Sequence, residues 1–525
     1  MIRQQGSPGS CGLGGAFDPA QNAARLSVFR YAETALMHTM AGWIARVPEL
    51  QVKIELARQV AFAAERADAL WKRVAQLLWP AERDVALHPA LARLLREMDE
   101  GAVDSASLLA GLGQVVLPRL VEGYGQHAAS TDPITDAPTV RLLERLKPEA
   151  LTLARWAMKQ AGQLTAGDGA RAARAREQVR RLNACWVEAG GWHGTPPEGV
   201  PGVSLLGELR RGPQGPQASI DGIARDEHFR ELAPGEAPPP EPLDTPAGRL
   251  AYLMRTLNFE LFAAELMGRN LYEYAHELPW QFTLDMARQC WDEARHAEIM
   301  VERIKATAVP WRPGEPGFAA YPLDNGPWHD IYPGGLFQRL VAMNRGIEAL
   351  ALDTHIYRAN TFEGLGDSTA ALTHTYIVAD EAPHVGFGTR WLRYLLFHQT
   401  DPRQADLALV PFFPIMGERF APEADPLGQE QLAAYEQAEQ EAWTAIASRR
   451  AQRLEREGRA DHAAAGAAEL GLGPAVVGVR RRDAVNRLAR RLAGFTPGEI
   501  DEAIAAAGGA SLAEEQAVTR PTRHA

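Results

Sequence analysis

Two short stretches share one pattern, Asp292-Glu-Ala-Arg-His296 and Asp380-Glu-Ala-Pro-His384. In each stretch the Glu and the His stand three residues apart, which places both side chains on one face of an α-helix. A four-helix bundle that holds two metal ions needs this pair on two helices and a single Glu on each of the other two. The pattern therefore predicts an all-α fold built around a carboxylate-bridged di-metal site.

The two single carboxylates can be sought from the geometry of helical hairpins, because residues at one depth are equidistant from the turn. The midpoint between Glu348 and Glu381 falls within Glu363-Gly-Leu-Gly-Asp367, a strong turn signal. The midpoint between Glu265 and Glu293 falls at Pro279. The predicted metal ligands are therefore Glu265, Glu293, His296, Glu348, Glu381 and His384.

Glu260 is the alternative to Glu265 on the first helix, since its midpoint with Glu293 also falls close to the break. Five residues separate Glu260 from Glu265, which turns the two side chains about 140° apart around the helix. The two are therefore not expected to bind in the same way, and Glu265 is the preferred ligand.

An aspartate precedes the glutamate of each motif. A metal-bound imidazole normally donates its second N–H group to a carboxylate or a similar acceptor. We therefore expect Asp292 to hold His384, and Asp380 to hold His296. Arg295 lies inside the first motif and is placed with these residues around the ligands.

Residues 245–400 resemble the ferritin-like superfamily of di-iron carboxylate proteins. The form of Asp292–His296 is similar to that of the di-iron monooxygenases and the ribonucleotide reductase small subunit. More narrowly, Asn258–Leu266, Glu348–Asp353 and Asp380–His384 resemble a largely uncharacterised bacterial ferritin-like family. The resemblance implies a di-metal four-helix bundle and leaves the substrate open.

The sequence departs from those patterns at two positions. Pro383 stands inside the second motif, where the monooxygenases would have Arg, and a proline there should kink or bulge the helix. Asn258 stands where the narrower family would have His, which bears on Glu260 as a ligand.

An earlier block of the chain looks like a diverged copy of the second. Leu56-Ala-Arg-Gln59 matches Met286-Ala-Arg-Gln289, and each follows a helix that carries a glutamate, Glu33 in the first block. On this alignment Arg66 replaces His296, so the first block keeps the helical frame and loses the ligands. The prediction is a tandem of ferritin-like bundles, the first degenerate and the second metal-binding.

The composition of the 525 residues and the positions of Pro- and Gly-rich stretches indicate further segments. Pro- and Gly-rich sequence separates the two helical blocks, and Ala, Glu and Arg dominate the end of the chain, where one helix is expected near Thr496. The expected segments are a flexible N-terminus (1–24), a degenerate helical domain (25–163), a linker or wrapping arm (164–245), the di-metal domain (246–400) and a helical extension (401–525).

The net charge of −11 argues against nucleic acid as the main partner. The three cysteines show no paired spacing, which fits a reducing cytoplasm. No uncharged apolar run is long enough to span a membrane, and no signal-peptide pattern is present at the start. A cytoplasmic protein is expected.

The expected function is an oxygen-dependent di-iron oxidoreductase, a monooxygenase or oxidase with two iron ions, or with manganese or a mixed Fe/Mn pair. Its partners would be dioxygen, a small or carrier-borne organic substrate and an external electron donor, with a homodimer as an assembly to test. One alternative is a ferroxidase, peroxide-scavenging or iron-storage protein, and another is a non-enzymatic scaffold with a relic metal site. His276, His355 and His374 lie two or three turns from predicted ligands and are candidates for proton transfer or substrate contact.

Overall fold

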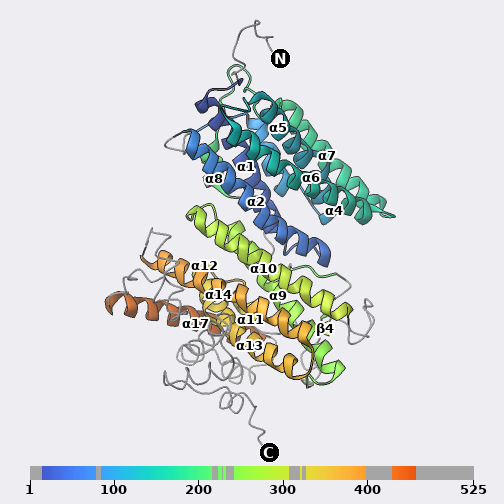
Figure 1. Cartoon of the computed structure of the whole chain (residues 1–525), viewed down its shortest axis with the longest axis vertical. Coiled ribbons are helices and arrows are strands. Elements are labelled where there is room, and N and C mark those ends of the chain that lie inside the picture. The colour runs from blue at the N-terminus through green and yellow to red at the C-terminus, as the bar shows by residue number, and fades with distance from the viewer. Residues whose placement is uncertain are drawn as a thin grey trace, which may run out of the picture. The chain divides into compact units, whose positions relative to one another are not determined.

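The computed structural model describes residues 15–78, 84–213, 215, 223–226, 229–231, 242–306, 320–321, 327–397 and 429–456. Helices make up most of this part of the chain (Figure 1). Its strands are two residues long: β1 (Ala86–Leu87) pairs antiparallel with β2 (Val203–Ser204), and β3 (Arg230–Glu231) pairs parallel with β4 (Ala320–Tyr321). The predicted all-α fold class is confirmed.

The first helices of the chain begin at residues suited to cap them. The Asp18 side chain accepts a hydrogen bond from the Gln21 N–H, and the Asp18 N–H donates one to the Gln21 side-chain oxygen. Pro19 occupies the first helical position. Asp136 caps a later helix in the same way, through the Thr139 N–H. The elements are α1 (Pro19–Trp43), α2 (Leu50–Leu77), α3 (Pro89–Glu100), α4 (Ser105–Gly111), the π-helix η1 (Leu112–Val116), α5 (Leu117–Ser130), α6 (Ala137–Thr165), α7 (Gly169–Ala189) and α8 (Leu205–Arg211).

Helix α7 lies within the segment that the sequence predicts to be a linker. It packs against α3 and α4. Leu182 is fully buried, and the Gln178 side chain donates a hydrogen bond of 2.8 Å to the Glu97 carbonyl. Gly190 ends the helix in the left-handed conformation, with φ of 64°. The Pro- and Gly-rich character of the segment therefore begins only after a packed helix.

The later helices turn where the hairpin argument places the turns. Helix α9 ends at Tyr274 and α10 begins at Trp280, while α13 ends at Gly364 and α14 begins at Ser368. Gly366 supplies a positive φ of 78° in the second turn. The elements are α9 (Pro246–Tyr274), α10 (Trp280–Lys305), α11 (Pro327–Ile331), α12 (Leu336–Leu340), the π-helix η3 (Val341–Ile347), α13 (Glu348–Gly364), α14 (Ser368–Phe397) and α17 (Gln429–Arg456).

The two parts of the chain share one order of elements. Each part begins with two long helices. After α3 in the first part and α11 in the second comes a helix with a π-helical turn, η1 or η3, and then a long helix with an internal proline, Pro148 or Pro383. Helix α14 is continuous from Ser368 to Phe397 across Pro383, and the π-helical irregularity lies in the preceding helix. Of the extension predicted for 401–525, α17 is described; the helix expected near Thr496 lies outside the described residues.

By their internal contacts the residues form two compact units. The first contains Met1–Phe229 and Glu260–Ala297, and the second contains Arg230–Phe259 and Glu298–Ala525. Each of the two helices α9 and α10 therefore contributes one part of its length to each unit. The boundary runs within these helices and not only through the Pro-rich segment.

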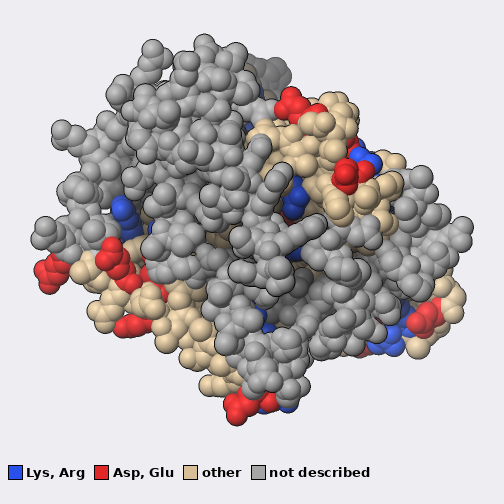
Figure 2. Space-filling model, turned by 90° about the horizontal axis from the view of Figure 1, so that it is seen from below, with Lys and Arg blue, Asp and Glu red and all other residues tan. Residues whose placement is uncertain are grey.

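Charged side chains are mixed on the face of the molecule seen in Figure 2. Among the described residues drawn there, Lys and Arg lie beside Asp and Glu and form no broad basic patch. In the described part of the chain, no helix has both the length and the apolar character needed to cross a membrane.

Candidate metal centre

Glu260, on α9, and the pair Glu293 and His296, on α10, lie together with their side chains buried. The His296 Nδ1 atom is 3.5 Å from an oxygen of Glu260 and 3.6 Å from an oxygen of Glu293. Two ligands that each lie about 2.1 Å from one ion are separated by about 3 to 3.5 Å. The spacing of these atoms is therefore that of ligands around a shared cation.

A second set comes from α13 and α14, which pack along each other. Glu348 is the first residue of α13, and Glu381 and His384 lie on one face of α14; all three are buried. The His384 Nδ1 atom is 2.9 Å from a carboxylate oxygen of Glu381. The i, i+3 spacing of the motif thus brings imidazole and carboxylate together as the sequence predicts.

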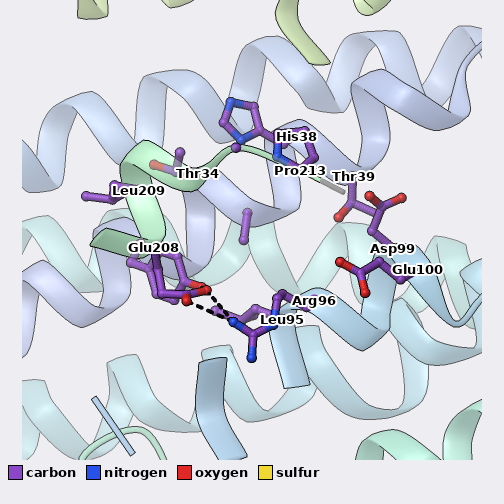
Figure 3. A pocket seen from close by; sticks show the side chains of 13 residues that line it. Thr34, His38, Thr39, Leu95, Arg96, Asp99, Glu100, Glu208, Leu209 and Pro213 are labelled. Carbon is purple, nitrogen blue, oxygen red and sulfur yellow. Dashed lines mark hydrogen bonds and ion pairs between the residues drawn. The ribbon is translucent and has the colours of Figure 1, made fainter. Parts of the chain in front are cut away.

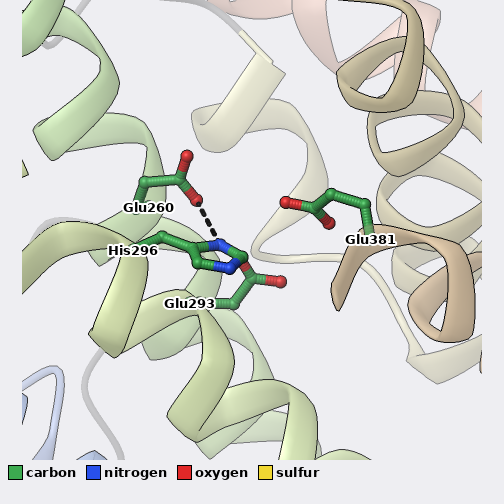
Figure 4. A group of neighbouring side chains, drawn as sticks. All are labelled: Glu260, Glu293, His296 and Glu381. Atoms are coloured by element: carbon green, nitrogen blue, oxygen red, sulfur yellow. Dashed lines mark ion pairs between the residues drawn. The ribbon is translucent and has the colours of Figure 1, made fainter. Parts of the chain in front are cut away.

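These residues form two overlapping groups that could each hold a metal ion. One group contains Glu260, Glu293, His296 and Glu381, and the other contains Glu293, Glu348, Glu381 and His384. Within each group, one ligand atom from every residue lies within 4.8 Å of all the others. Figure 4 shows the first group, with the Glu381 carboxylate directed toward Glu293 and His296. Glu293 and Glu381 belong to both groups, the position that bridging carboxylates occupy between two ions.

The charge of this centre fits two divalent cations. Four glutamates of the two groups are buried, and isolated carboxylates are costly to bury without compensation. Two divalent ions would match four carboxylates, and the remaining ligands would be two neutral imidazoles. Oxygen and imidazole donors suit iron or manganese, and no cysteine belongs to either group among the described residues. The residues present therefore fit a di-metal pair.

Glu265, the preferred ligand from sequence, is engaged elsewhere. Its carboxylate accepts a hydrogen bond of 2.7 Å from Lys53 Nζ and is also held by both terminal nitrogens of Arg225, Nη2 at 2.9 Å. Burial lowers the pKa of Lys53 to about 8, and the charge of Glu265 opposes that shift. Two cationic side chains therefore neutralise Glu265. The residue of α9 in the groups that could hold a metal is Glu260, the sequence alternative, and a ligand role for Glu265 stays a prediction.

The residues placed around the ligands have contacts of their own. Asp292 is buried and accepts hydrogen bonds from Arg288 Nε at 2.7 Å and from Arg295 Nη2 at 2.9 Å. Arg295 therefore orients a carboxylate that directly precedes the ligand Glu293. The expected hydrogen bonds, in which His384 donates to Asp292 and His296 donates to Asp380, stay predictions.

The π-helix η3 contacts the backbone of His384, and no pattern in the sequence predicts this π-helix. Asn344, which is fully buried in η3, donates a hydrogen bond of 2.9 Å to the His384 carbonyl. A Cβ atom on Gly388 would come within 2.4 Å of the Asn344 Cβ atom, so this glycine allows η3 to approach α14. The π-helix ends at Ile347, and α13 begins at the next residue, Glu348. Single π-helical turns are frequent at functional sites, and this one sets the start of a ligand helix.

Two of the three histidines proposed for proton transfer or substrate contact form a pair. The Nδ1 atoms of His355 and His374 are 2.8 Å apart, and the hydroxyl of Tyr252 is 3.4 Å from His374 Nε2. His276 lies instead beside Glu277, with 3.5 Å between His276 Nε2 and the carboxylate, and near His38. The structure thus separates His276 from the other two.

Comparison with known proteins gives one match. Residues 204–422 match the sequence model of the family DUF455, which is described as a protein of unknown function. This span contains every residue of the two ligand groups. No curated protein and no solved structure matches the chain.

Proposed function

We propose that the chain is a di-iron oxidoreductase of ferritin-like type, which uses dioxygen to oxidise an organic substrate. The observation that supports this proposal best is the sharing of Glu293 and Glu381 by both ligand groups. A shared pair of carboxylates would hold two ions within one site. A site for a single ion does not need shared carboxylates. Bound iron would supply electrons to dioxygen, and an external donor would restore them.

The ligands divide into equivalent sets. Glu260 and His296 would serve one ion, and Glu348 and His384 the other. Glu293 and Glu381 would contribute to holding both ions, and a bound pair of this kind would supply a redox-active site for dioxygen.

The helices exclude water from the ligands. Apolar residues beside them on α9 and α10, such as Leu257, Leu261 and Ala297, are fully or almost fully buried. A dry site strengthens the electrostatic interactions of the bound ions and protects reactive species from side reactions. Asp292, held by Arg288 and Arg295, would keep the first motif oriented toward a bound ion.

The proposal is tested by loading the full-length, metal-free protein with ferrous iron under anaerobic conditions and then adding dioxygen. We expect uptake of about two iron ions per chain and a visible absorption band that depends on oxygen. Glu381→Ala should abolish the band, and Glu302→Gln, which changes an exposed residue of α10, should retain it.

Oxygen consumption no faster than that of free ferrous iron, with no spectral change, would overturn the oxidoreductase. Accumulation of iron far beyond two ions per chain would point instead to storage.

A further inference from the structure

One cavity, of about 440 Å³, is lined by residues of α9, α10, α13 and α14. Small-molecule sites generally occupy roughly 300 to 1,000 Å³, so the cavity has the size of a ligand pocket. Its apolar wall is built by buried side chains of all four helices. They are Leu253, Met300, Phe362 and Ala370.

Three residues that line this cavity, one on each of α9, α10 and α14, stand one heptad from a candidate metal ligand. On α9, Leu253 is seven residues before Glu260; on α14, His374 is seven residues before Glu381. On α10, Arg303 follows His296 by seven residues. Seven residues are close to two full turns, so each lining residue lies on the ligand face of its helix, about 10 Å along the axis. A molecule held in the cavity is therefore directed toward the ligand residues.

The charges of the lining favour an anion. Arg303 Nη2 lies 2.5 Å from Asp367, whose other oxygen accepts the Ala370 N–H at the start of α14. That aspartate is therefore already neutralised. Arg249 also lines the cavity, and among the described residues no acidic side chain pairs with it. The two arginines and one aspartate sum to one positive charge beside an apolar wall.

His374 adds a fixed polar group to the wall. Its ring stacks on Phe362, with the ring centroids 5.4 Å apart and 12° between the planes, and it is paired with His355. A ring held in this way keeps one orientation toward the cavity. It can position a polar group of a bound molecule and exchange a proton with its partner histidine.

Two other cavities lined by described residues lack this combination. In the one shown in Figure 3, about 60 Å³ in volume, Arg96 Nη1 donates to both carboxylate oxygens of Glu208, each at 2.8 Å. Asp99 there accepts hydrogen bonds from Trp43 and Tyr272. A cavity of about 230 Å³ is lined by Arg30, whose guanidinium already stacks 3.3 Å from the centre of the Trp71 ring.

We propose that the cavity of 440 Å³ binds a small organic anion with an apolar chain, such as a carboxylic acid, with Arg249 as the residue that binds the anionic group. That the bound anion is the substrate rests on the proposed function; its binding does not. The pocket can therefore be tested without metal.

The test uses isothermal titration calorimetry on the full-length, iron-free protein with three probes of equal chain length: octanoate, 1-octanol and octylammonium. We expect octanoate to bind at least about tenfold more tightly than the other two, which corresponds to about 1.4 kcal/mol. Arg249→Met keeps the aliphatic stem and removes the charge, and it should weaken octanoate binding at least about tenfold.

Arg255→Met is the matched control, because Arg255 is an exposed residue of the same helix outside the cavity lining. It should leave octanoate binding unchanged. Absence of octanoate binding, equal affinity for the three probes, or an equal effect of both substitutions would overturn the proposed pocket. If octanoate binds as expected while iron-loaded protein fails to react with oxygen, the pocket stands and the proposed function falls.

Discussion

Two buried acidic clusters in this chain differ in how their negative charge is met. In the first, Arg66 Nε and Nη2 donate to the two carboxylate oxygens of Glu33 at 2.8 and 2.9 Å, and the Tyr124 hydroxyl donates to Glu33 at 2.6 Å. In the second, four glutamates gather around His296 and His384. The alignment of the two blocks places Arg66 at the position of His296.

The difference shows how one helical frame can serve two purposes. A guanidinium fixed in the chain neutralises a carboxylate permanently, whereas imidazole and carboxylate ligands leave the compensation to exchangeable ions. Glu265 is likewise neutralised by side chains of the protein, Lys53 and Arg225, although it lies on α9, which also carries Glu260 of the second cluster. The presence of a buried Arg or Lys partner therefore separates the structural glutamates from the candidate metal ligands.

The largest expected effect on stability comes from breaking the first cluster. Arg66→Ala leaves the buried Glu33 carboxylate without its cation and should lower the free energy of unfolding by roughly 3 to 5 kcal/mol. Urea denaturation followed by circular dichroism measures this loss. The double variant Glu33→Gln, Arg66→Met removes both charges and should recover most of it. A loss below about 1 kcal/mol in the single variant would show that the ion pair does not replace a metal as the neutralising element.

Glu265→Gln sharpens the distinction between structural and ligating glutamates. It leaves Lys53 and Arg225 buried without their anion, so the free energy of unfolding should fall by roughly 2 to 4 kcal/mol. Iron content, measured by plasma mass spectrometry at a temperature where the variant is folded, should remain that of the wild type. Glu260→Gln should give the opposite result, with lower iron content and little loss of stability. Reversal of these outcomes would restore Glu265 as the ligand.

A smaller effect is expected where η3 approaches α14. The Cβ atom in Gly388→Ala would overlap Asn344, at a cost of roughly 1 to 3 kcal/mol, and would shift the carbonyl contact that holds His384. Gly364→Ala is the matched control, since a Cβ atom there meets nothing within 4 Å. Iron retention after dialysis should fall in the first variant and not in the second. Equal retention would mean that η3 does not position the ligand.

The smallest effect concerns three histidines outside the candidate metal groups: His38 and His127, which are buried, and His193, which is partly buried. Burial lowers the pKa of His38 to about 3, of His127 to about 4 and of His193 to about 3. Below pH 6.5 the unfolded chain takes up protons that the folded chain does not, so the free energy of unfolding should fall as the pH drops from 6.5 toward 4. Burial raises the pKa of Asp99 to about 6, which contributes stability at low pH that is lost as the pH rises through about 6.

Urea denaturation of iron-free protein between pH 4 and 7 measures the balance, in which three histidines outweigh one aspartate. His38→Gln should reduce the dependence on pH below 6.5. If the free energy of unfolding of that variant depended on pH as it does in the wild type, His38 would not contribute to the pH dependence.

Local spacing predicted much of this centre, and contacts distant in the sequence decided the rest. The i, i+3 motifs and the hairpin turns led to Glu293, His296, Glu348, Glu381 and His384, because helical periodicity alone fixes which side chains share a face. Both Glu260 and Glu265 satisfied the hairpin test. The choice between them depends on Lys53, which is 212 residues from Glu265, and on Arg225, which lies in a Pro- and Gly-rich segment.

Other features left weaker signals in the sequence. The helix Gly169–Ala189 is assigned to the linker because prolines are frequent in the sequence that follows it. The chemistry of proline predicts an irregularity of the helix at Pro383. The π-helical turn is instead η3, which contains no proline. A proline marks a lost hydrogen bond, but a π-helical turn arises from packing, here that of Asn344 against Gly388.

The central claim is that Glu293 and Glu381 are shared by two ions, and the iron content of single variants tests it most directly. Anaerobically loaded and desalted wild-type protein should hold about two iron ions per chain. Glu260→Ala and Glu348→Ala should each hold about one, and Glu293→Ala and Glu381→Ala fewer than about one, with circular dichroism confirming that each variant is folded. Wild-type protein with only traces of iron, or a Glu293→Ala variant that still holds about two ions, would contradict the account.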